Sequence, residues 1–184
     1  AFEYSEKYGT PVFLRPTTRV CHGYASIMVK DKTEYIHHQP DGFIKDSRRW
    51  VIFPKLSFMN HQKIEARNQE LATVFSSYEK NRIHPSCETF KESKKGIATG
   101  GISYTYAMET MKNSGMIKTL KVATPHPFPE KLAVEFLTGL DEVLCLEELD
   151  PVIERELIYI CGKYHLPTRI SGKLSGHTAC AGEN

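Results

Sequence analysis

Short apolar segments alternate with helical patterns through the second half of the chain, and this alternation constrains the fold more than any other feature. The apolar segments lie at 96–99, 117–123 and 143–146, and the helical patterns lie at 103–112, from 129 and from 151. Such alternation is typical of parallel β-sheets that are covered by helices on both faces. The sequence therefore predicts an α/β fold with three αβα layers and a mostly parallel sheet over residues 94–178, with a last short strand at 168–170.

Proline and glycine mark the ends of these predicted elements. Pro129 and Pro151 each open a helix, because the fixed φ of proline suits the first helical turn. Asp150 precedes Pro151 and is predicted to cap that helix, and Gly162 is predicted to end it. Pro125 stops the preceding strand, since proline cannot donate to a sheet.

The opening segment has a different pattern. A polar helix is predicted at 3–8 and is ended by Gly9, and Pro11–Leu14 is predicted as a short apolar strand. A single strand cannot form a stable sheet. We therefore expect this strand to pair with a sheet whose other strands lie in the later unit, in another copy or in missing sequence.

Residues 31–93 are predicted to form a connecting arm, because aromatic, proline and charged residues occur there without alternation. From Asn60 the apolar residues recur at helical intervals. This spacing predicts an amphipathic helix over 60–79, capped by Asn60, that lies across a neighbouring surface.

Charge and cysteine content exclude several classes of protein. The chain of 184 residues carries 24 Lys and Arg against 22 Asp and Glu, so it has no strong field that would hold a nucleic acid. No apolar run approaches the roughly 20 residues of a membrane-spanning helix. The five cysteines include no CxxC pair, which argues against a zinc or iron–sulfur site and favours reduced thiols in the cytoplasm.

Ligands of parallel sheets bind at the carboxyl ends of the strands. The predicted strands place Thr99–Ser103, Thr124–Pro129 and Glu147–Asp150 at that edge. Gly100, Gly101 and Ser103 could present backbone N–H groups to an anion at the start of a helix. The alternative is a turn and packing role, because the glycines do not match G-x-G-x-x-G.

The acidic group at the third edge also has two interpretations. A buried Glu147 or Glu148 could act as a general acid or base, because burial raises a carboxylate pKa. Alternatively, Asp150 caps the helix while the glutamates face solvent or pair with basic groups.

The segment that follows Leu14 contains arginines and hydroxyls that could hold a carboxylate substrate, namely Arg15, Thr17, Thr18 and Arg19. Cys21 and His22 could form a nucleophile pair, but neighbours in an extended chain point to opposite faces. The His37-His38 pair has no Cys or carboxylate at ligand spacing, so a metal site is not expected.

Five segments strung along the chain together resemble the alpha subunits of the indolepyruvate:ferredoxin oxidoreductases, which are thiamine-diphosphate-dependent 2-oxoacid:ferredoxin oxidoreductases. These segments are GTPVFLRPTTRVCH, FIKDSRRWVIFP, KKGIATGGISYTYAME, LKVATPHPFPEKLAVEF and VLCLEELDPVIERELIYICGK. The resemblance implies that residues 1–30 end a pyrimidine-binding-type domain and that residues 94–178 form a transketolase C-terminal-like domain.

The resemblance also implies a reaction and its participants. The whole enzyme would decarboxylate indolepyruvate or a similar aryl 2-oxoacid oxidatively to the acyl-CoA, with ferredoxin as electron acceptor. It would use thiamine diphosphate, magnesium and iron–sulfur clusters. This chain lacks the GDG motif that would hold magnesium and the diphosphate, and it lacks the cysteine array that would hold the clusters. Its partners would be the rest of the alpha chain, a beta subunit, coenzyme A and further copies of itself in a homo-oligomer.

Within this chain the resemblance assigns Thr17, Thr18 and Arg19 to the oxoacid, and Gly100, Gly101 and Ser103 to a cofactor such as coenzyme A. Cys21 stands where the family pattern has a small residue such as Ser, which puts a chemical role for its thiol in doubt. No catalytic residue is expected here. Two alternatives remain: a noncatalytic docking module, and a small free-standing binder of a nucleotide or coenzyme A.

Overall fold

A computed structural model of the chain describes residues 1–36, 39–84, 94–111 and 117–181. A five-stranded sheet forms its centre, in the order β1-β3-β2-β4-β5. The strands are β1 (Arg82–His84), β2 (Lys95–Gly100), β3 (Lys118–Val122), β4 (Glu142–Leu146) and β5 (Arg169–Ser171). All neighbours are parallel except β1, which pairs with β3 in the antiparallel direction. The predicted mostly parallel α/β sheet is confirmed, and the sequence analysis missed β1.

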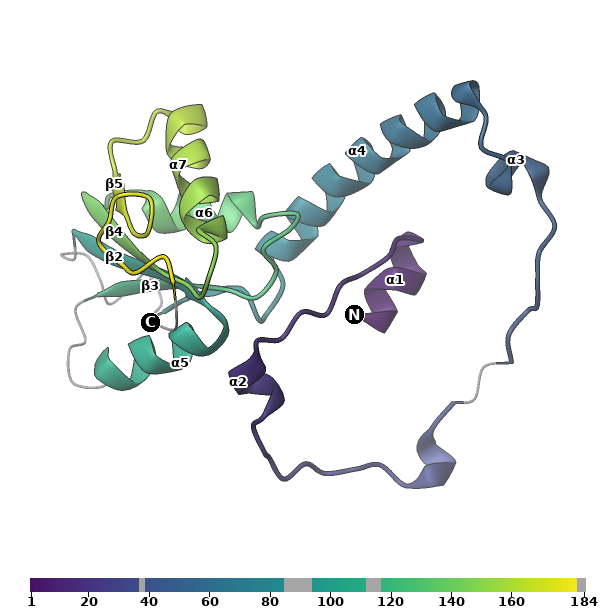
Figure 1. The fold of residues 1–184 in the computed structure, drawn as a ribbon, viewed down its shortest axis with the longest axis horizontal. Helices are drawn as coiled ribbons and strands as arrows, with labels where there is room; N and C mark the ends of the chain where they lie inside the picture. The colour runs from purple at the N-terminus through teal and green to yellow at the C-terminus, as the bar shows by residue number, and fades with distance from the viewer. Residues whose placement is uncertain (37–38, 85–93, 112–116, 182–184) are drawn as a thin grey trace.

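Helices cover both faces of this sheet (Figure 1). Helices α6 (Glu130–Leu137) and α7 (Val152–Tyr164) lie on one face, and α5 (Gly101–Thr110) lies on the other. Alternate residues of the strands explain this arrangement, because Ala98 and Cys145 belong to the buried core with α6 and α7, whereas Ile97 and Leu146 line a cavity beside α5.

The start of α7 differs from the prediction. Pro151 is the cap position, and the carboxylate of Glu147 accepts the hydrogen bonds of the first free N–H groups. The cap predicted at Asp150 is therefore wrong, because the side chain of Asp150 is exposed while Glu147 lies inside the turn. The helix also continues past Gly162 to Tyr164, and His165 ends it in the left-handed conformation.

The N-terminal helix agrees with the prediction. Helix α1 (Phe2–Tyr8) ends at Gly9, whose φ of 54° is the left-handed conformation that glycine adopts without strain. Tyr4 packs edge-on against Phe75 and Tyr78, with ring centroids 5.5 and 5.9 Å away. The start of the chain is thereby fixed to the helix that precedes the sheet.

The strand predicted at Pro11–Leu14 is not formed. These residues are not part of the sheet, and Phe13 and Leu14 are exposed. A strand exists only through its hydrogen-bonded neighbour, and none of the described segments pairs with this one. Only short helical turns interrupt the exposed path that follows: α2 (Thr18–Cys21), η1 (Lys32–Glu34) and α3 (Ser47–Trp50).

Helix α4 (Pro54–Ser76) overlaps the helix predicted over 60–79, but it begins six residues earlier and ends three residues earlier. Pro54 occupies its first turn, which is a favourable place for proline, and Asn60 is an interior residue rather than the predicted cap. Leu71 and Phe75 are buried near its end, while its first half extends away from the sheet (Figure 1).

Asn81 joins α4 to the sheet. Its amide nitrogen donates to the carbonyl of Phe75 at 2.9 Å and to the hydroxyl of Thr124 at 2.6 Å. Its amide oxygen accepts from the backbone N–H of Ala123 at 2.7 Å. One buried side chain thus ties the end of α4 to the carboxyl end of β3.

The described helices include none that combines the length and the apolar character needed to cross a membrane.

Candidate functional site

A cleft of about 490 Å³ lies at the carboxyl edge of the sheet. Loops after β3 and β4 form one wall, and the N-terminal segment 15–19 forms the other. The lining residues are Arg15, Pro16, Thr17, Thr18, Arg19, Pro125, Glu148, Leu149, Asp150 and Val152. The structure therefore brings two of the three predicted sheet edges together with the predicted substrate-binding segment.

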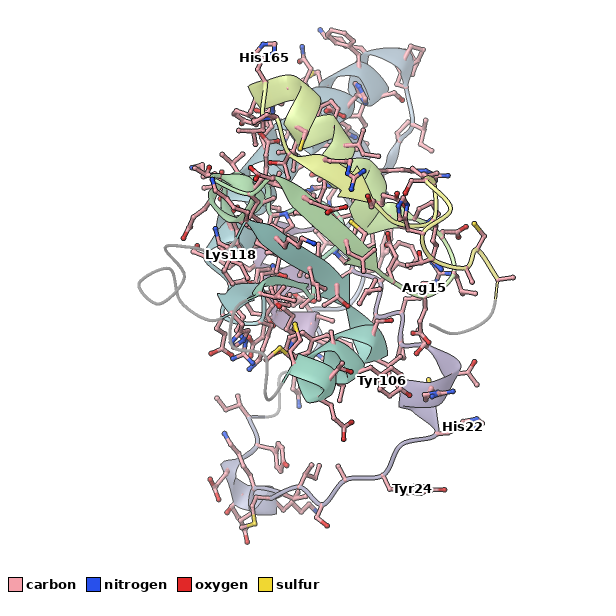
Figure 2. All side chains as sticks on the ribbon, turned by 90° about the vertical axis from the view of Figure 1, so that its left-hand side faces the viewer. Arg15, His22, Tyr24, Tyr106, Lys118 and His165 are labelled. Carbon is pink, nitrogen blue, oxygen red and sulfur yellow. The ribbon has the colours of Figure 1, made fainter. Side chains whose placement is uncertain are left out.

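Arg19 holds the N-terminal segment on the body of the protein. Its guanidinium donates a hydrogen bond to the hydroxyl of Tyr106 on α5 and lies 5.7 Å from the centre of that ring. Figure 2 shows Arg15 and Tyr106 on this side of the molecule. Tyr106 was not predicted from the sequence, because the helical pattern around it does not show that Arg19, 87 positions earlier in the chain, will contact it.

Thr17 and Thr18 begin the short helix α2. Thr17 is its cap residue, but its hydroxyl makes no cap hydrogen bond. The Oγ1 atom of Thr17 is buried and lacks a hydrogen-bond partner in the described part of the chain. A hydroxyl of this kind beside two arginines suits an oxyanion ligand. The geometry therefore allows Thr17, Thr18 and Arg19 to bind the oxoacid, and this role stays a prediction.

The acidic residues divide between the cleft and the interior. Glu148 and Asp150 line the cleft, and Leu149 between them has a φ of 59°, which makes the turn tight. Glu147 is buried, and its oxygens accept from the N–H groups of Ile153 at 2.8 Å and Glu154 at 3.0 Å. Burial raises the pKa of Glu147 and outweighs these hydrogen bonds, which lower it.

Gly100, Gly101 and Ser103 lie outside the lining of this cleft. A Cβ on Gly100 would meet the carbonyl oxygen of Val122 at 2.7 Å, so Gly100 allows β2 and β3 to pack closely. Gly101 has a φ of 57°, and its turn lies beside Glu148. Ser103 is buried without a hydrogen-bond partner and lines an apolar cavity of about 180 Å³ with Ile97 and Leu146. Their predicted role in cofactor binding stays a prediction.

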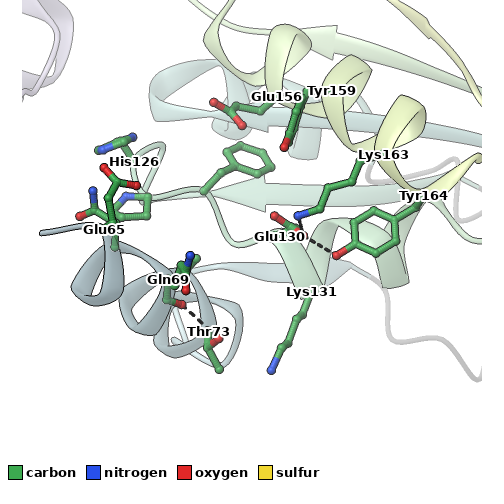
Figure 3. A pocket seen from close by; sticks show the side chains of 14 residues that line it. Glu65, Gln69, Thr73, His126, Glu130, Lys131, Glu156, Tyr159, Lys163 and Tyr164 are labelled. Carbon is green, nitrogen blue, oxygen red and sulfur yellow. Dashed lines mark hydrogen bonds and ion pairs between the residues drawn. The ribbon is translucent and has the colours of Figure 1, made fainter. Parts of the chain in front are cut away.

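A larger groove of about 640 Å³ lies between α4, α6 and α7 (Figure 3). Glu130 is bonded there to the ammonium group of Lys163 at 2.6 Å and to the hydroxyl of Tyr164. Burial acts to raise the pKa of Glu130, but these two hydrogen bonds and the charge of Lys163 together lower it. The sequence analysis missed this groove, whose walls come from segments far apart in the chain.

The described residues do not suit the metal and cluster sites of the implied enzyme. Cys145 is fully buried, and burial raises the pKa of its thiol, as it does for Cys161, so neither is poised to bind a metal as thiolate. Cys21 and Cys180 are free and exposed. Across the described part of the chain, no three His, Cys, Asp or Glu side chains converge on one point. His37 and His38 lie outside the described residues.

The Cys21 and His22 alternative gains no support from the geometry. Both residues are exposed, and Cys21 ends α2 while His22 follows it as the cap. Neighbouring side chains on a helical turn diverge as they do in a strand.

Comparison with known proteins gives a consistent set of relatives. The chain is 35% identical over 178 residues to indolepyruvate oxidoreductase subunit IorA of Methanothermobacter thermautotrophicus, a match that covers 96% of this chain and 28% of that protein. It is 33% identical over 162 residues to the subunit of the same name from Pyrococcus abyssi, covering 85% of this chain and 24% of the relative. No protein-family model matches the chain.

Among solved structures, a 2-oxoglutarate:ferredoxin oxidoreductase from Magnetococcus marinus matches with a TM-score of 0.47 and 18% identity. That match covers 71% of this chain and 21% of the other chain. The chain thus spans less than a third of the length of the curated relatives that it matches. Over nearly its whole length it is related to one segment of indolepyruvate oxidoreductase subunit IorA, the family that its five sequence segments resemble.

Proposed function

We propose that this chain is a noncatalytic segment of an enzyme that oxidatively decarboxylates indolepyruvate or a similar aryl 2-oxoacid to the acyl-CoA, with ferredoxin as electron acceptor. The names of its relatives support this proposal, as does the small share of their length that the chain spans, 28% and 24% for the two relatives described above. In the whole enzyme, thiamine diphosphate with magnesium would supply the decarboxylation chemistry and iron–sulfur clusters the electron transfer.

The exposed apolar residues 11–59, called the exposed arm from here on, support the proposal that this chain serves assembly. The surface area of the chain is 13785 Å², about half as much again as the roughly 9,000 Å² of a compact monomer of 21.0 kDa. Most of the large hydrophobic side chains that are exposed lie between residues 11 and 59, among them Phe13, Tyr24, Met28, Phe43 and Ile52. A monomeric protein rarely exposes so much apolar surface, so this arm is suited to bind other polypeptide.

The proposed partners are the rest of the alpha chain, a beta subunit and a second copy in a homo-oligomer, within the cytoplasm. In this proposal, residues 1–30 complete a pyrimidine-binding-type domain, 31–93 connect the domains and 94–178 form a transketolase C-terminal-like domain. The free thiols of Cys145 and Cys161 are consistent with a reducing compartment.

The cleft at the carboxyl edge is proposed to receive the carboxylate of the oxoacid. Arg15 and Arg19 supply positive charge, and the hydroxyls of Thr17 and Thr18 supply donors. These residues bind and orient the substrate, and no proton transfer is assigned to them.

Coenzyme A binding at Gly100, Gly101 and Ser103 is the second candidate, favoured by the unpartnered hydroxyl of Ser103. Titration with coenzyme A tests it: saturable binding that is lost in Ser103→Ala supports this candidate. Equal heats of coenzyme A binding for the wild-type chain and for Ser103→Ala argue against this candidate.

Light scattering tests the assembly role. We expect the chain to associate with itself as concentration rises, because an uncovered apolar arm binds another copy when its native partner is missing. Replacing Phe43 and Ile52 by Ser is expected to reduce that association without loss of the folded sheet, since both side chains are exposed. A chain that remains monomeric at high concentration would contradict the proposal.

Calorimetry tests the noncatalytic part of the proposal. Micromolar binding of thiamine diphosphate and magnesium would show that a catalytic site is present.

A further inference from the structure

Two positive side chains lie directly opposite each other on the antiparallel pair β1 and β3. Arg82 is the register partner of Lys121, and His84 is the partner of Thr119 two pairs further along, on the same face. Cross-strand partners on one face have their Cβ atoms about 5 Å apart, so the two like charges repel each other and destabilise the pair. The fold therefore keeps a costly arrangement at this edge of the sheet.

Tyr104 of α5 lies against all three basic residues. Its hydroxyl accepts a hydrogen bond from the Arg82 guanidinium at 3.3 Å, and the ammonium group of Lys121 lies 4.6 Å from the centre of its ring. The ring of His84 is 6.1 Å away at an angle of 37°. Arg82, His84, Lys121 and Tyr104 are called the β1–β3 cluster below.

The neighbouring carboxylate does not neutralise this cluster. Glu79 feels the charge of Arg82, but it is paired with Lys80 at 2.6 Å. Among the described residues, neither Arg82 nor Lys121 has a carboxylate within ion-pair distance. The ring and hydroxyl of one tyrosine offset two full charges only in part.

His84 adds a nitrogen without a partner. Its Nε2 atom is buried and makes no hydrogen bond with the residues that the structure describes. Burial lowers the pKa of His84, and the charges of Arg82 and Lys121 lower it further. Tyr104 also stands in the first turn of α5, whose positive dipole end favours an anion nearby.

We propose that the β1–β3 cluster binds a phosphoryl group, either as free phosphate or as the phosphate of a small ester. A phosphoryl group carries about two negative charges at neutral pH and three acceptor oxygens, which match the two cations, Arg82 and Lys121. A carboxylate brings one charge and would leave the other cation unneutralised. This inference does not depend on the proposed enzyme function, because the cluster shares no residue with the cleft.

Calorimetric titration of the 184-residue chain with inorganic phosphate and with adenosine monophosphate tests the proposal. We expect saturable binding at low ionic strength, and a loss of affinity of about tenfold or more in Lys121→Gln and in Arg82→Gln. Lys163→Gln is the matched control, because that lysine lies on α7 and is paired with Glu130, and its affinity is expected to be unchanged. Tighter binding of adenosine monophosphate than of phosphate indicates a phosphate ester, and equal binding indicates free phosphate.

Nuclear magnetic resonance of His84 provides a second readout that does not depend on the variants. Bound phosphate is expected to raise the pKa of His84, because an anion offsets the repulsion from Arg82 and Lys121. The proposal is overturned if neither ligand saturates the chain up to roughly 10 mM, a limit that corresponds to a negligible affinity. It is also overturned if Lys121→Gln binds phosphate as tightly as Lys163→Gln does.

Discussion

The carboxylate of Glu147, at the end of β4, lies 2.8 Å from the backbone nitrogen of Ile153 and accepts its hydrogen bond. The same carboxylate binds the N–H of Glu154 at 3.0 Å. These two bonds cap α7 from within the loop that precedes it. They also fix the turn that presents Glu148 and Asp150 to the cleft.

Removing this cap is expected to destabilise the fold. Glu147→Ala leaves two backbone N–H groups without a partner in a buried turn, and we expect a loss of about 2 kcal/mol in the free energy of unfolding by urea. Asp150→Ala is the control, because the exposed Asp150 side chain makes no cap bond, and its effect is expected to stay within about 0.5 kcal/mol. Equal losses in the two variants would contradict the assignment of the cap.

The raised pKa of Glu147 gives a pH dependence with a defined sign. The unfolded chain ionises near the ordinary value of 4.5, whereas the buried carboxyl in the folded chain holds its proton to higher pH. The stabilisation is therefore complete below 4.5 and is lost as the pH rises through the folded pKa. Urea unfolding of the wild type and of Glu147→Gln across this range should show the wild type losing stability relative to the variant as pH rises. A constant difference would contradict the raised pKa.

Asn81 is expected to be among the most sensitive polar residues. Asn81→Ala removes the partners of the Phe75 carbonyl and the Ala123 N–H, both at a buried junction, and we expect a loss of about 2–4 kcal/mol. Asn60→Ala, the same substitution inside α4, is expected to be neutral or slightly stabilising, since alanine favours helices. Chemical denaturation measures both. Similar values would show that Asn81 does not join α4 to β3.

Two glycine substitutions are expected to have opposite signs. Gly100→Ala places a methyl group 2.7 Å from the Val122 carbonyl oxygen. Because this oxygen belongs to the backbone of β3 and cannot move away easily, we expect the free energy of unfolding to fall by about 2 kcal/mol or more. Gly162→Ala meets no atom within 4 Å in α7 and is expected to add about 0.5–1 kcal/mol of stability. Thermal unfolding of both variants checks the signs, and a destabilised Gly162→Ala would show that the helix ends where its glycine lies.

The contact of Arg19 with Tyr106 is expected to protect the N-terminal segment. Tyr106→Phe removes a hydrogen bond of about 1 kcal/mol, so trypsin should cleave after Arg19 several times faster. Tyr106→Leu also removes the ring beneath the guanidinium and should increase the rate further. Tyr24→Phe is the control, because Tyr24 is fully exposed and its hydroxyl contacts no other segment. An unchanged cleavage rate in both Tyr106 variants would contradict the docking of this segment.

The parts of the fold that depend on local pattern could be predicted from the sequence. The strands β2, β3 and β4 each carry apolar residues between turn signals, and helical patterns follow them, so their succession along the chain follows from this alternation. The strand β1 could not be predicted, because its three residues include Arg82 and His84 and are held by their pairing with β3.

The site shows the same division. The sequence singled out Arg15, Thr17, Thr18 and Arg19 as candidates for binding a carboxylate, because residue types indicate chemistry, and that role stays a prediction. It did not reveal that Tyr106 binds Arg19, that Glu147 replaces Asp150 as the cap, or that Arg82 lies opposite Lys121. Each of these contacts depends on tertiary packing or on strand register, and neither can be predicted from the periodicity of a single segment.

Trp50, the single tryptophan of the chain, lies in the exposed arm and donates a hydrogen bond to the carbonyl of Ile44 at 2.9 Å. Its fluorescence therefore reports directly on whether the arm is a docking surface. As chain concentration rises, we expect the Trp50 emission to shift to shorter wavelength and its quenching by iodide to fall, in step with the increase in mass. An emission and quenching constant that do not change while the mass increases would show that the chain associates through another surface, and would contradict the assembly role of the arm.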